Sequence, residues 1–223
     1  MTDRLTLAVV TAGLSEDSTT TRLGEAIAKA ASGVVEHAGQ HVEIKVIRLR
    51  DLAHGLTDMM ITHVASPAVQ DAIDTALTAD GLVAASPTYK ASYSGLFKQF
   101  FDVIDESALE NLPTVVAATG GSPRHSLVLD TALRPLLSYL KALVLPLGIY
   151  AASEDWGHHD LQRRIDRVGA SLAAVVLAGS PGGASDLLDD NDDAAARPGL
   201  RREVKDEFSN VPDFASLLAS VGS

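Results

Sequence analysis

Short apolar runs alternate with stretches of helical periodicity along most of the chain. Residues 5–10 form an almost continuous apolar run, which is typical of a strand buried on both faces. Leu23, Ile27 and Val34 then follow at helical spacing, which indicates a helix with one apolar face. Repetition of this pattern predicts strands at about 5–10, 42–49, 81–85, 113–118 and 144–151. It predicts helices at about 23–34, 67–78, 93–104, 125–143 and 159–177, the fourth bent at Pro135.

Strands that alternate with helices through short connections imply right-handed crossovers and a parallel sheet covered on both faces. Five strands favour the flavodoxin-like order 2-1-3-4-5 over a six-stranded dinucleotide-binding fold. We therefore predict an α/β fold for residues 1–178, a doubly wound five-stranded parallel sheet. From Gly179 the sequence becomes small, acidic and rich in Gly and Pro. Residues 179–223 are thus predicted to form an acidic flexible linker and a short C-terminal tail, which either docks on a partner surface or frays.

Composition narrows the classes of function. The 223 residues include 18 Lys and Arg against 29 Asp and Glu, and the formal net charge of −11 argues against nucleic-acid binding, which needs clustered cations. The absence of cysteine excludes disulfides, thiolate nucleophiles and cysteine-bound metals, and it suits a cytoplasmic protein. No apolar stretch approaches the roughly 20 residues that span a bilayer. We therefore expect an enzyme or a small-ligand binder that acts away from nucleic acid and membrane.

Ligands of an open parallel sheet bind at the carboxyl ends of the strands, so the loops after the first, third and fourth strands matter most. The first loop places Ser15, Ser18, Thr19 and Thr20 around the start of a helix, where hydroxyls, backbone amides and the helix dipole favour an anion. Neither a Walker loop nor a G-x-G-x-x-G pattern is present. The alternative interpretation is that Ser18 only caps the helix.

The loop after the third strand has the composition of a contact for a flat ligand. Pro87 is predicted to fix a turn and to leave the backbone amides of Thr88, Tyr89 and Lys90 free for the polar edge of a heterocycle. Tyr89 adds an apolar face. Lys98, in the following helix, is interpreted as an ordinary solvent-facing lysine.

The loop after the fourth strand contains a glycine pair. It reads Thr119-Gly120-Gly121-Ser122, and the two glycines let the backbone approach a ligand closely. A plain turn is the alternative for any such pair, but the position at the same edge as the other two loops favours ligand contact. His125, at the start of the next helix, either contacts the ligand or has no role in the site.

Three segments carry a family resemblance and occur in order along the chain. They are 86–95 with Lys98 and Asp102, 119–122 with His125, and 129–136. Together they resemble the NADPH-dependent FMN reductase family, especially the branch that supplies reduced flavin to two-component monooxygenases. The resemblance covers about residues 5–177. It implies a flavodoxin-like fold, FMN as cofactor, NADPH or NADH as hydride donor, small-molecule nucleotide substrates and a flavin-dependent monooxygenase as partner.

The resemblance also implies which residues contact the phosphate and the ring of FMN. The phosphate corresponds to Ser15, Ser18, Thr19 and Thr20. The isoalloxazine ring corresponds to Pro87, Thr88, Tyr89 and Lys90 and, on the other loop, to Thr119, Gly120, Gly121 and Ser122. Further candidates for the site are Ser94 and His125.

The chain departs from the family pattern in two places. The family often has an arginine in the phosphate loop, whereas Glu16 and Asp17 stand here and Arg22 comes later, so the residue that neutralises the phosphate is left open. Some flavin-exchanging relatives carry an inserted aromatic near residues 130–133, which produces a π-bulge at a tetramer interface. This chain has no aromatic there. We therefore hypothesise that FMN is held firmly as a prosthetic group.

Hydride transfer from a nicotinamide to a flavin needs no protein nucleophile, because the cofactor carries the chemistry. No catalytic residue and no metal site are therefore predicted, and His158-His159-Asp160 is interpreted as solvated surface. Two alternative functions remain open. One is an FMN-containing NAD(P)H quinone or azo reductase, and the other is a non-catalytic FMN electron carrier.

The predicted helix over 125–143 bears on the oligomeric state. It contains more leucines than one face of a sheet needs, namely Leu127, Leu129, Leu133, Leu136, Leu137 and Leu140. An excess of apolar surface predicts a homodimer or homotetramer, and the alternative is a helix buried within the monomer.

Overall fold

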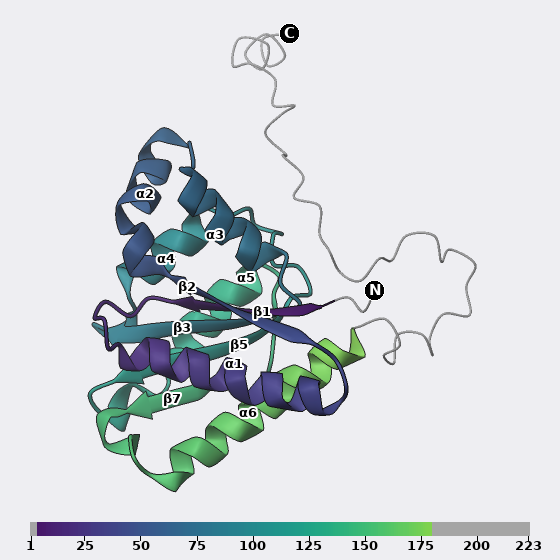
Figure 1. Ribbon diagram of the computed structural model, residues 1–223. Helices are drawn as coiled ribbons and strands as arrows, with labels where there is room; N and C mark the ends of the chain where they lie inside the picture. Colours follow the sequence, from purple (N-terminus) through teal and green to yellow (C-terminus); the bar gives the residue numbers. More distant parts are fainter. Residues whose placement is uncertain (1–3, 180–223) are drawn as a thin grey trace, which may run out of the picture.

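A central sheet lies between two layers of helices in the computed structural model, which describes residues 4–179 (Figure 1). Helices α1 (Thr19–His37) and α6 (His159–Ala178) cover one face. The other face is covered by α2 (Leu49–Thr62), α3 (Pro67–Leu77), α4 (Gly95–Asp102) and α5 (Arg134–Tyr139). The predicted linker and tail over 179–223 lie outside the described residues, except for Gly179.

The sheet has the predicted strand order but more strands than expected. Within the described residues it has seven strands, not five, and its main path is β2-β1-β3-β5-β6. The principal strands are β1 (Leu5–Thr11), β2 (Val42–Arg48), β3 (Gly81–Tyr89) and β5 (Pro113–Gly120), all paired in parallel. Because β5 is the fourth principal strand along the chain, the order 2-1-3-4-5 is confirmed.

The predicted fifth strand is two strands. β6 (Leu143–Val144) and β7 (Ile149–Ala152) each pair with β5, at opposite ends of it. Between them Pro146 has no backbone N–H to give to a ladder. Gly148 passes so close to β5 that an added Cβ would lie 2.8 Å from the Val116 carbonyl oxygen.

A β-hairpin adds the remaining strand and corrects the predicted turn after Pro87. β3 continues through Pro87 to Tyr89, and β4 (Ser92–Tyr93) pairs antiparallel with its end. The two-residue connection has Lys90 at φ 51° and Ala91 at φ 63°. Left-handed conformations at both positions define the tight turn of a hairpin, where asparagine and glycine are the favoured residues. Residues with a Cβ there cost about 1–2 kcal/mol each.

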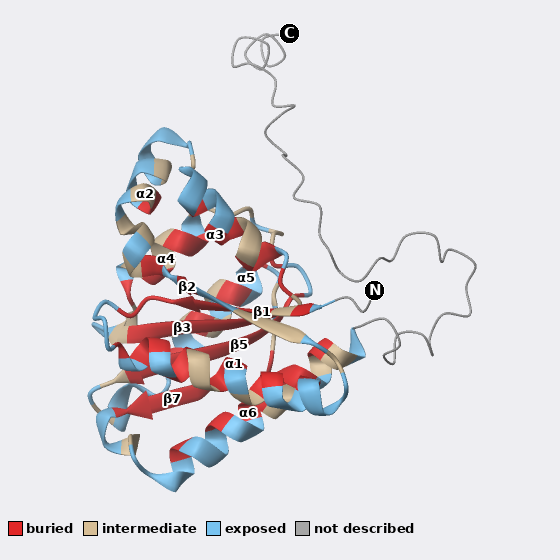
Figure 2. Cartoon of the chain, viewed as in Figure 1, coloured by how far each residue is buried: buried red, intermediate tan, exposed pale blue. Residues whose placement is uncertain are grey.

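The buried residues form two apolar clusters, one on each face of the sheet, which Figure 2 shows as red strands and red inner helix faces. Ser66 caps α3 by accepting a hydrogen bond from the Val69 amide at 3.3 Å. Helix α2 was not predicted, although Leu49, Leu52, Leu56 and Met59 follow one another at helical spacing and pack against the core. Within residues 4–179, no helix combines the length and the apolar character that a membrane crossing requires.

The prediction of one bent helix over 125–143 is wrong. The segment contains a 3₁₀ turn, η1 (Pro123–His125), a π-helix, η2 (Leu129–Leu133), and then α5. Pro135 has no N–H for the carbonyl of residue 131, so an α-helical ladder cannot continue through this point unchanged. A π-helix therefore forms here although the chain has no inserted aromatic. The hypothesis that FMN is held firmly took the missing aromatic to mean that no π-bulge forms, and it loses this support.

Most leucines of this segment are buried within the chain itself. Leu129, Leu133, Leu137 and Leu140 all lie in the core, whereas Leu127 is 67% exposed. The apolar excess that predicted a homodimer or homotetramer is therefore smaller than the sequence indicated. The oligomeric state stays a prediction.

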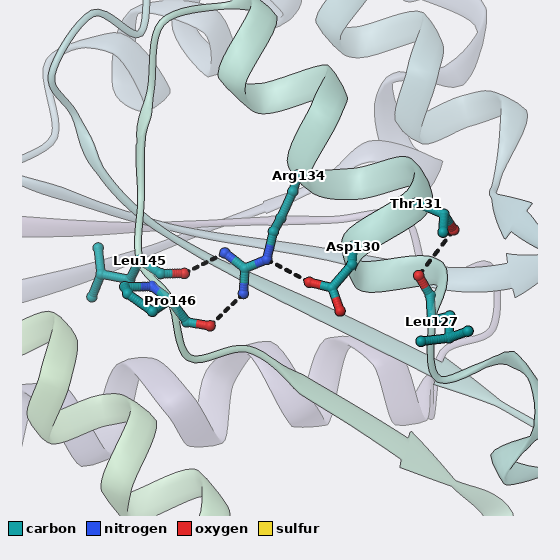
Figure 3. Close-up of polar contacts among 6 residues, drawn as sticks. All are labelled: Leu127, Asp130, Thr131, Arg134, Leu145 and Pro146. Atoms are coloured by element: carbon teal, nitrogen blue, oxygen red, sulfur yellow. Dashed lines mark hydrogen bonds and ion pairs between the residues drawn. The ribbon is translucent and has the colours of Figure 1, made fainter.

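Arg134 joins the π-helix to the break between β6 and β7 (Figure 3). Its Nε donates to Asp130 Oδ1 at 2.7 Å, and its Nη2 donates to the Pro146 carbonyl at 2.6 Å. Its Nη1 donates to the Leu145 carbonyl. One guanidinium thus donates to two carbonyls that lie outside the strands, and it is a main contact between these two irregular segments.

We predict that Arg134→Met lowers the free energy of unfolding by about 1.5–3 kcal/mol, because two carbonyls lose charge-assisted hydrogen bonds. Urea unfolding followed by circular dichroism measures the change. Arg163→Met is the matched control, since Arg163 forms only an exposed pair with Asp160 on α6. Equal stability of the Arg134 variant and the control would contradict the prediction.

Ala91→Gly should raise the free energy of unfolding by about 1 kcal/mol, because glycine adopts the left-handed conformation of Ala91 without steric cost. Ala174→Gly, at an exposed interior position of α6, should lower it by a similar amount. Urea unfolding of both variants provides the comparison, and the same sign for the two changes would refute the strain at Ala91.

Candidate functional site

The three loops singled out in the sequence lie at one edge of the sheet. β1, β3 and β5 are adjacent and parallel, so their carboxyl ends coincide. Thr11 is level with Ala85, and Pro87 is level with Thr119. This is the edge at which open α/β sheets bind ligands.

Hydroxyl groups connect the first loop to the third. Thr20 Oγ1 lies 2.7 Å from Thr119 Oγ1 in a buried contact between residues 99 positions apart in sequence. Ser18 is the N-cap of α1 and accepts from the Thr21 amide at 3.3 Å. Ser18 thus caps α1, as the alternative interpretation held, and it adjoins Thr19 and Thr20, two other candidates for contact with the phosphate. Ser15 and Thr19 are exposed at the rim.

The first loop folds tightly around the start of α1. An added Cβ at Gly13 would lie 1.8 Å from Ser18 Oγ, so only glycine permits this path. The first turn of α1 contains no acidic residue. The amides of Thr19 and Thr20, at the first two helical positions, have no partner inside the helix and remain available to an anion.

An arginine pairs with one of the two acidic residues of this loop. Glu16 Oε1 lies 3.2 Å from Arg50 Nη2, and Arg50 Nε lies 3.5 Å from Asp51. Arg22 stacks over the Trp156 ring at 5.2 Å from its centroid. Sequence reasoning missed Arg50. Its signal is a position just after β2, which ends at the same edge as β1.

The second loop presents one exposed ring and one unpaired hydroxyl. Pro87 is buried, Thr88 half-buried, and Tyr89 and Lys90 exposed, with Tyr89 at 47%. Thr88 Oγ1 is itself buried and makes no hydrogen bond of good geometry within residues 4–179. Contrary to the sequence prediction, the backbones of Thr88 and Tyr89 pair with β4.

The third loop packs against a tyrosine that sequence reasoning missed. Tyr150 Oη donates to the Ser122 carbonyl at 2.8 Å. An added Cβ at Gly120 would lie 2.0 Å from the same hydroxyl oxygen, so Gly120 has to be glycine. Burial raises the pKa of the Tyr150 phenol, the nearby Thr88 hydroxyl lowers it in part although its geometry falls short of a hydrogen bond, and the Asp155 carboxylate raises it. A single tyrosine near the end of a buried strand gives little signal in a sequence.

The remaining candidates differ in their surroundings. Ser94 is buried and caps α4, accepting from the Phe97 amide at 3.2 Å, so its oxygen already has a structural partner. Its own amide donates to Ser86 Oγ at 2.9 Å. His125 is exposed on η1. Lys98 pairs with Asp102 along α4.

The site has the chemistry that a phosphorylated flat heterocycle requires. Hydroxyls and helix amides gather at the β1 loop, and an exposed aromatic ring and a glycine pair stand at the neighbouring loops. The unpaired Thr88 hydroxyl offers a hydrogen bond to a ligand. These groups fit the parts of FMN, since hydroxyls and helix amides suit a phosphate and an exposed ring beside a close backbone suits a flat heterocycle.

Comparison with known proteins identifies relatives of the same kind. Residues 5–157 match the model of the NADPH-dependent FMN reductase family. The chain is 37% identical over 190 residues to an FMN reductase (NADPH) of Pseudomonas aeruginosa, which covers 84% of this chain and 98% of that protein. It is 38% identical over 176 residues to the NADH-dependent FMN reductase SfnE of Pseudomonas putida, covering 79% and 89% respectively.

Solved structures agree with the sequence relatives. An oxidoreductase from Corynebacterium diphtheriae has a TM-score of 0.76 at 44% identity, covering 79% of this chain and 98% of that one. An apo NADH:FMN oxidoreductase, EMOB, has a TM-score of 0.67 at 26% identity, covering 76% and 88%. The predicted class, an oxidoreductase that uses FMN and a nicotinamide nucleotide, is confirmed. The matched residues run from β1 to the loop after β7 and include all three site loops, and the chain therefore belongs to the NADPH-dependent FMN reductase family.

Proposed function

We propose that this chain reduces FMN with NADPH or NADH and passes the reduced flavin to a flavin-dependent monooxygenase partner. The observation that carries the proposal is the buried contact between Thr20 and Thr119, because it joins the anion-binding loop to a ring-contacting loop. A phosphate held by one loop then places the attached ring against the other. We also propose a cytoplasmic location, which the absence of cysteine supports.

The residues of the site bind and orient. Bound FMN would supply the redox chemistry, since its ring takes up the hydride that the nicotinamide ring loses. Ser15, Ser18, Thr19 and Thr20 would surround the phosphate with neutral donors. Arg50 offsets the charge of Glu16, and the guanidinium of Arg22, over Trp156, would add positive charge near the start of α1.

The ring contacts come from the two neighbouring loops. Pro87 and Thr88 lie at the end of β3, and the Thr88 hydroxyl would donate to a polar atom of the ring. Tyr89 and Lys90 border the ring at the exposed hairpin, opposite the loop formed by Thr119, Gly120, Gly121 and Ser122. The site needs no side-chain acid or base, because its contribution is to hold two flat rings in contact.

Steady-state oxidation of NADPH and of NADH, followed at 340 nm with FMN added, tests the proposal. We expect turnover that depends on FMN and that releases reduced flavin to a monooxygenase or to oxygen. No turnover with either nucleotide would favour the FMN electron carrier. Turnover that requires a quinone or an azo compound, with little reduction of free FMN, would favour the quinone or azo reductase.

Thr119→Val should raise the Kd for FMN about tenfold, because Thr20 Oγ1 loses its buried partner and the two loops lose their connection. Quenching of flavin fluorescence measures the Kd. Thr78→Val is the control, since the Thr78 hydroxyl is exposed and bonds only to the Asp74 carbonyl of its own helix. An unchanged Kd in the Thr119 variant, with its fold intact by circular dichroism, would show that this contact does not shape the site.

A further inference from the structure

The hydroxyl of Tyr150 lies where the two ring-contacting loops meet. It donates to the Ser122 carbonyl at 2.8 Å, although Tyr150 belongs to β7 and lies level with Ala118 in β5. The Cβ position of Gly120 lies 2.0 Å from the Tyr150 hydroxyl oxygen and 3.6 Å from Thr88 Cβ. One phenol therefore contacts the third loop directly and stands close to the second.

Tyr150 is held from several directions. Its side chain is 6% exposed and packs in the apolar cluster beneath α3, α4 and α5. Its carbonyl accepts from Arg164 Nη1 at 3.0 Å, and Arg164 also pairs with Asp155 at 3.1 Å. Asp155 Oδ2 in turn accepts from the Ala152 amide at 2.8 Å. The position of the phenol is thus determined by the core and by the end of β7, and not by the loop that it contacts.

The third loop needs such a support. Gly120 and Gly121 are adjacent, and glycine has more backbone freedom than any other residue. The Ser122 carbonyl belongs to a peptide bond with Pro123, which has no N–H, so this peptide can be held only through its oxygen. The Tyr150 hydroxyl holds that oxygen. A tyrosine phenol is protonated at neutral pH and can therefore donate, and burial raises the pKa of this one further above its ordinary value.

We propose that Tyr150 is a positioning residue for the flavin ring. Its hydroxyl fixes the loop of Gly120, Gly121 and Ser122 in the conformation that contacts the isoalloxazine, and it occupies the space that a side chain at position 120 would need. This inference rests on the proposed function, because it takes the ligand of this edge to be FMN. Tyr150 touches the loop and acts on the flavin through it.

The test compares four proteins: the unchanged chain, Tyr150→Phe, Gly120→Ala and the double variant. Tyr150→Phe should raise the Kd for FMN about fivefold to tenfold and shift the visible circular dichroism of the bound flavin, with little change in the thermal unfolding midpoint. Gly120→Ala should weaken FMN binding further, because its Cβ meets the hydroxyl. In the double variant the alanine should cost less than it does alone, since the ring carbon lies 3.1 Å from that Cβ and the hydroxyl oxygen is gone.

Tyr139→Phe is the matched control, because Tyr139 belongs to α5, is 63% exposed and donates to Glu106 Oε1 at 2.6 Å, not to a residue of the three loops. It should leave the Kd for FMN unchanged. A second measurement needs no flavin: amide hydrogen exchange of Gly121 and Ser122 should be faster in the Tyr150→Phe protein and unchanged in the control.

The outcomes separate this inference from the proposed function. If the unchanged chain binds and reduces FMN, but Tyr150→Phe matches it in Kd, flavin circular dichroism and loop exchange, the positioning role is overturned and the proposed function stands. Additive effects of the two substitutions would also overturn the role, because they would show that the hydroxyl and position 120 act independently. If the unchanged chain does not bind FMN, the proposed function fails and this inference fails with it.

Discussion

Parallel pairing of three adjacent strands is the constraint on which the site depends. Because β1, β3 and β5 run in the same direction, their loops meet at one edge although they are separated widely in sequence. The contact between Thr20 and Thr119 joins residues 99 positions apart and exists only because the sheet aligns the two strand ends. None of the three loops contains enough donors to define a ligand by itself. Together they present hydroxyls, helix amides, an aromatic ring and a close backbone, which match the parts of one cofactor.

The features that the sequence predicted are those determined by local patterns. Buried strands appear as apolar runs, so β1, β2, β3 and β5 were placed to within a few residues. Features determined by a distant partner were missed. Pro87 suggests a turn, but its register with Thr119 keeps β3 extended to Tyr89. The predicted helix over 125–143 follows leucine spacing, which does not show that Arg134 draws the segment toward the carbonyls of Leu145 and Pro146.

The candidate site follows the same division. Its loops were predicted because polar, glycine-rich segments after buried strands are visible in a sequence. The residues that support these loops were not predicted. Arg50, in the first turn of α2, acts by pairing with Glu16, and Tyr150, in β7, acts through its hydrogen bond to the Ser122 carbonyl. Backbone strain was equally invisible. Lys90 and Ala91 adopt a left-handed conformation only because β3 and β4 pair directly on either side of them.

The charge of the chain sets a last physical problem, because a protein of net charge −11 has to attract phosphorylated ligands. At this net charge the protein as a whole does not attract a phosphate at long range, so the phosphate has to be bound by short-range contacts in the site. Neutral hydroxyls and helix amides serve this purpose, since they bind an anion by hydrogen bonds whatever the net charge. Arg50 adds to this by pairing with Glu16, which offsets one of the two acidic charges of the loop. The absence of an arginine within the loop is therefore compatible with phosphate binding, because Arg50 at the start of α2 neutralises Glu16 and the hydroxyls and amides bind the anion directly.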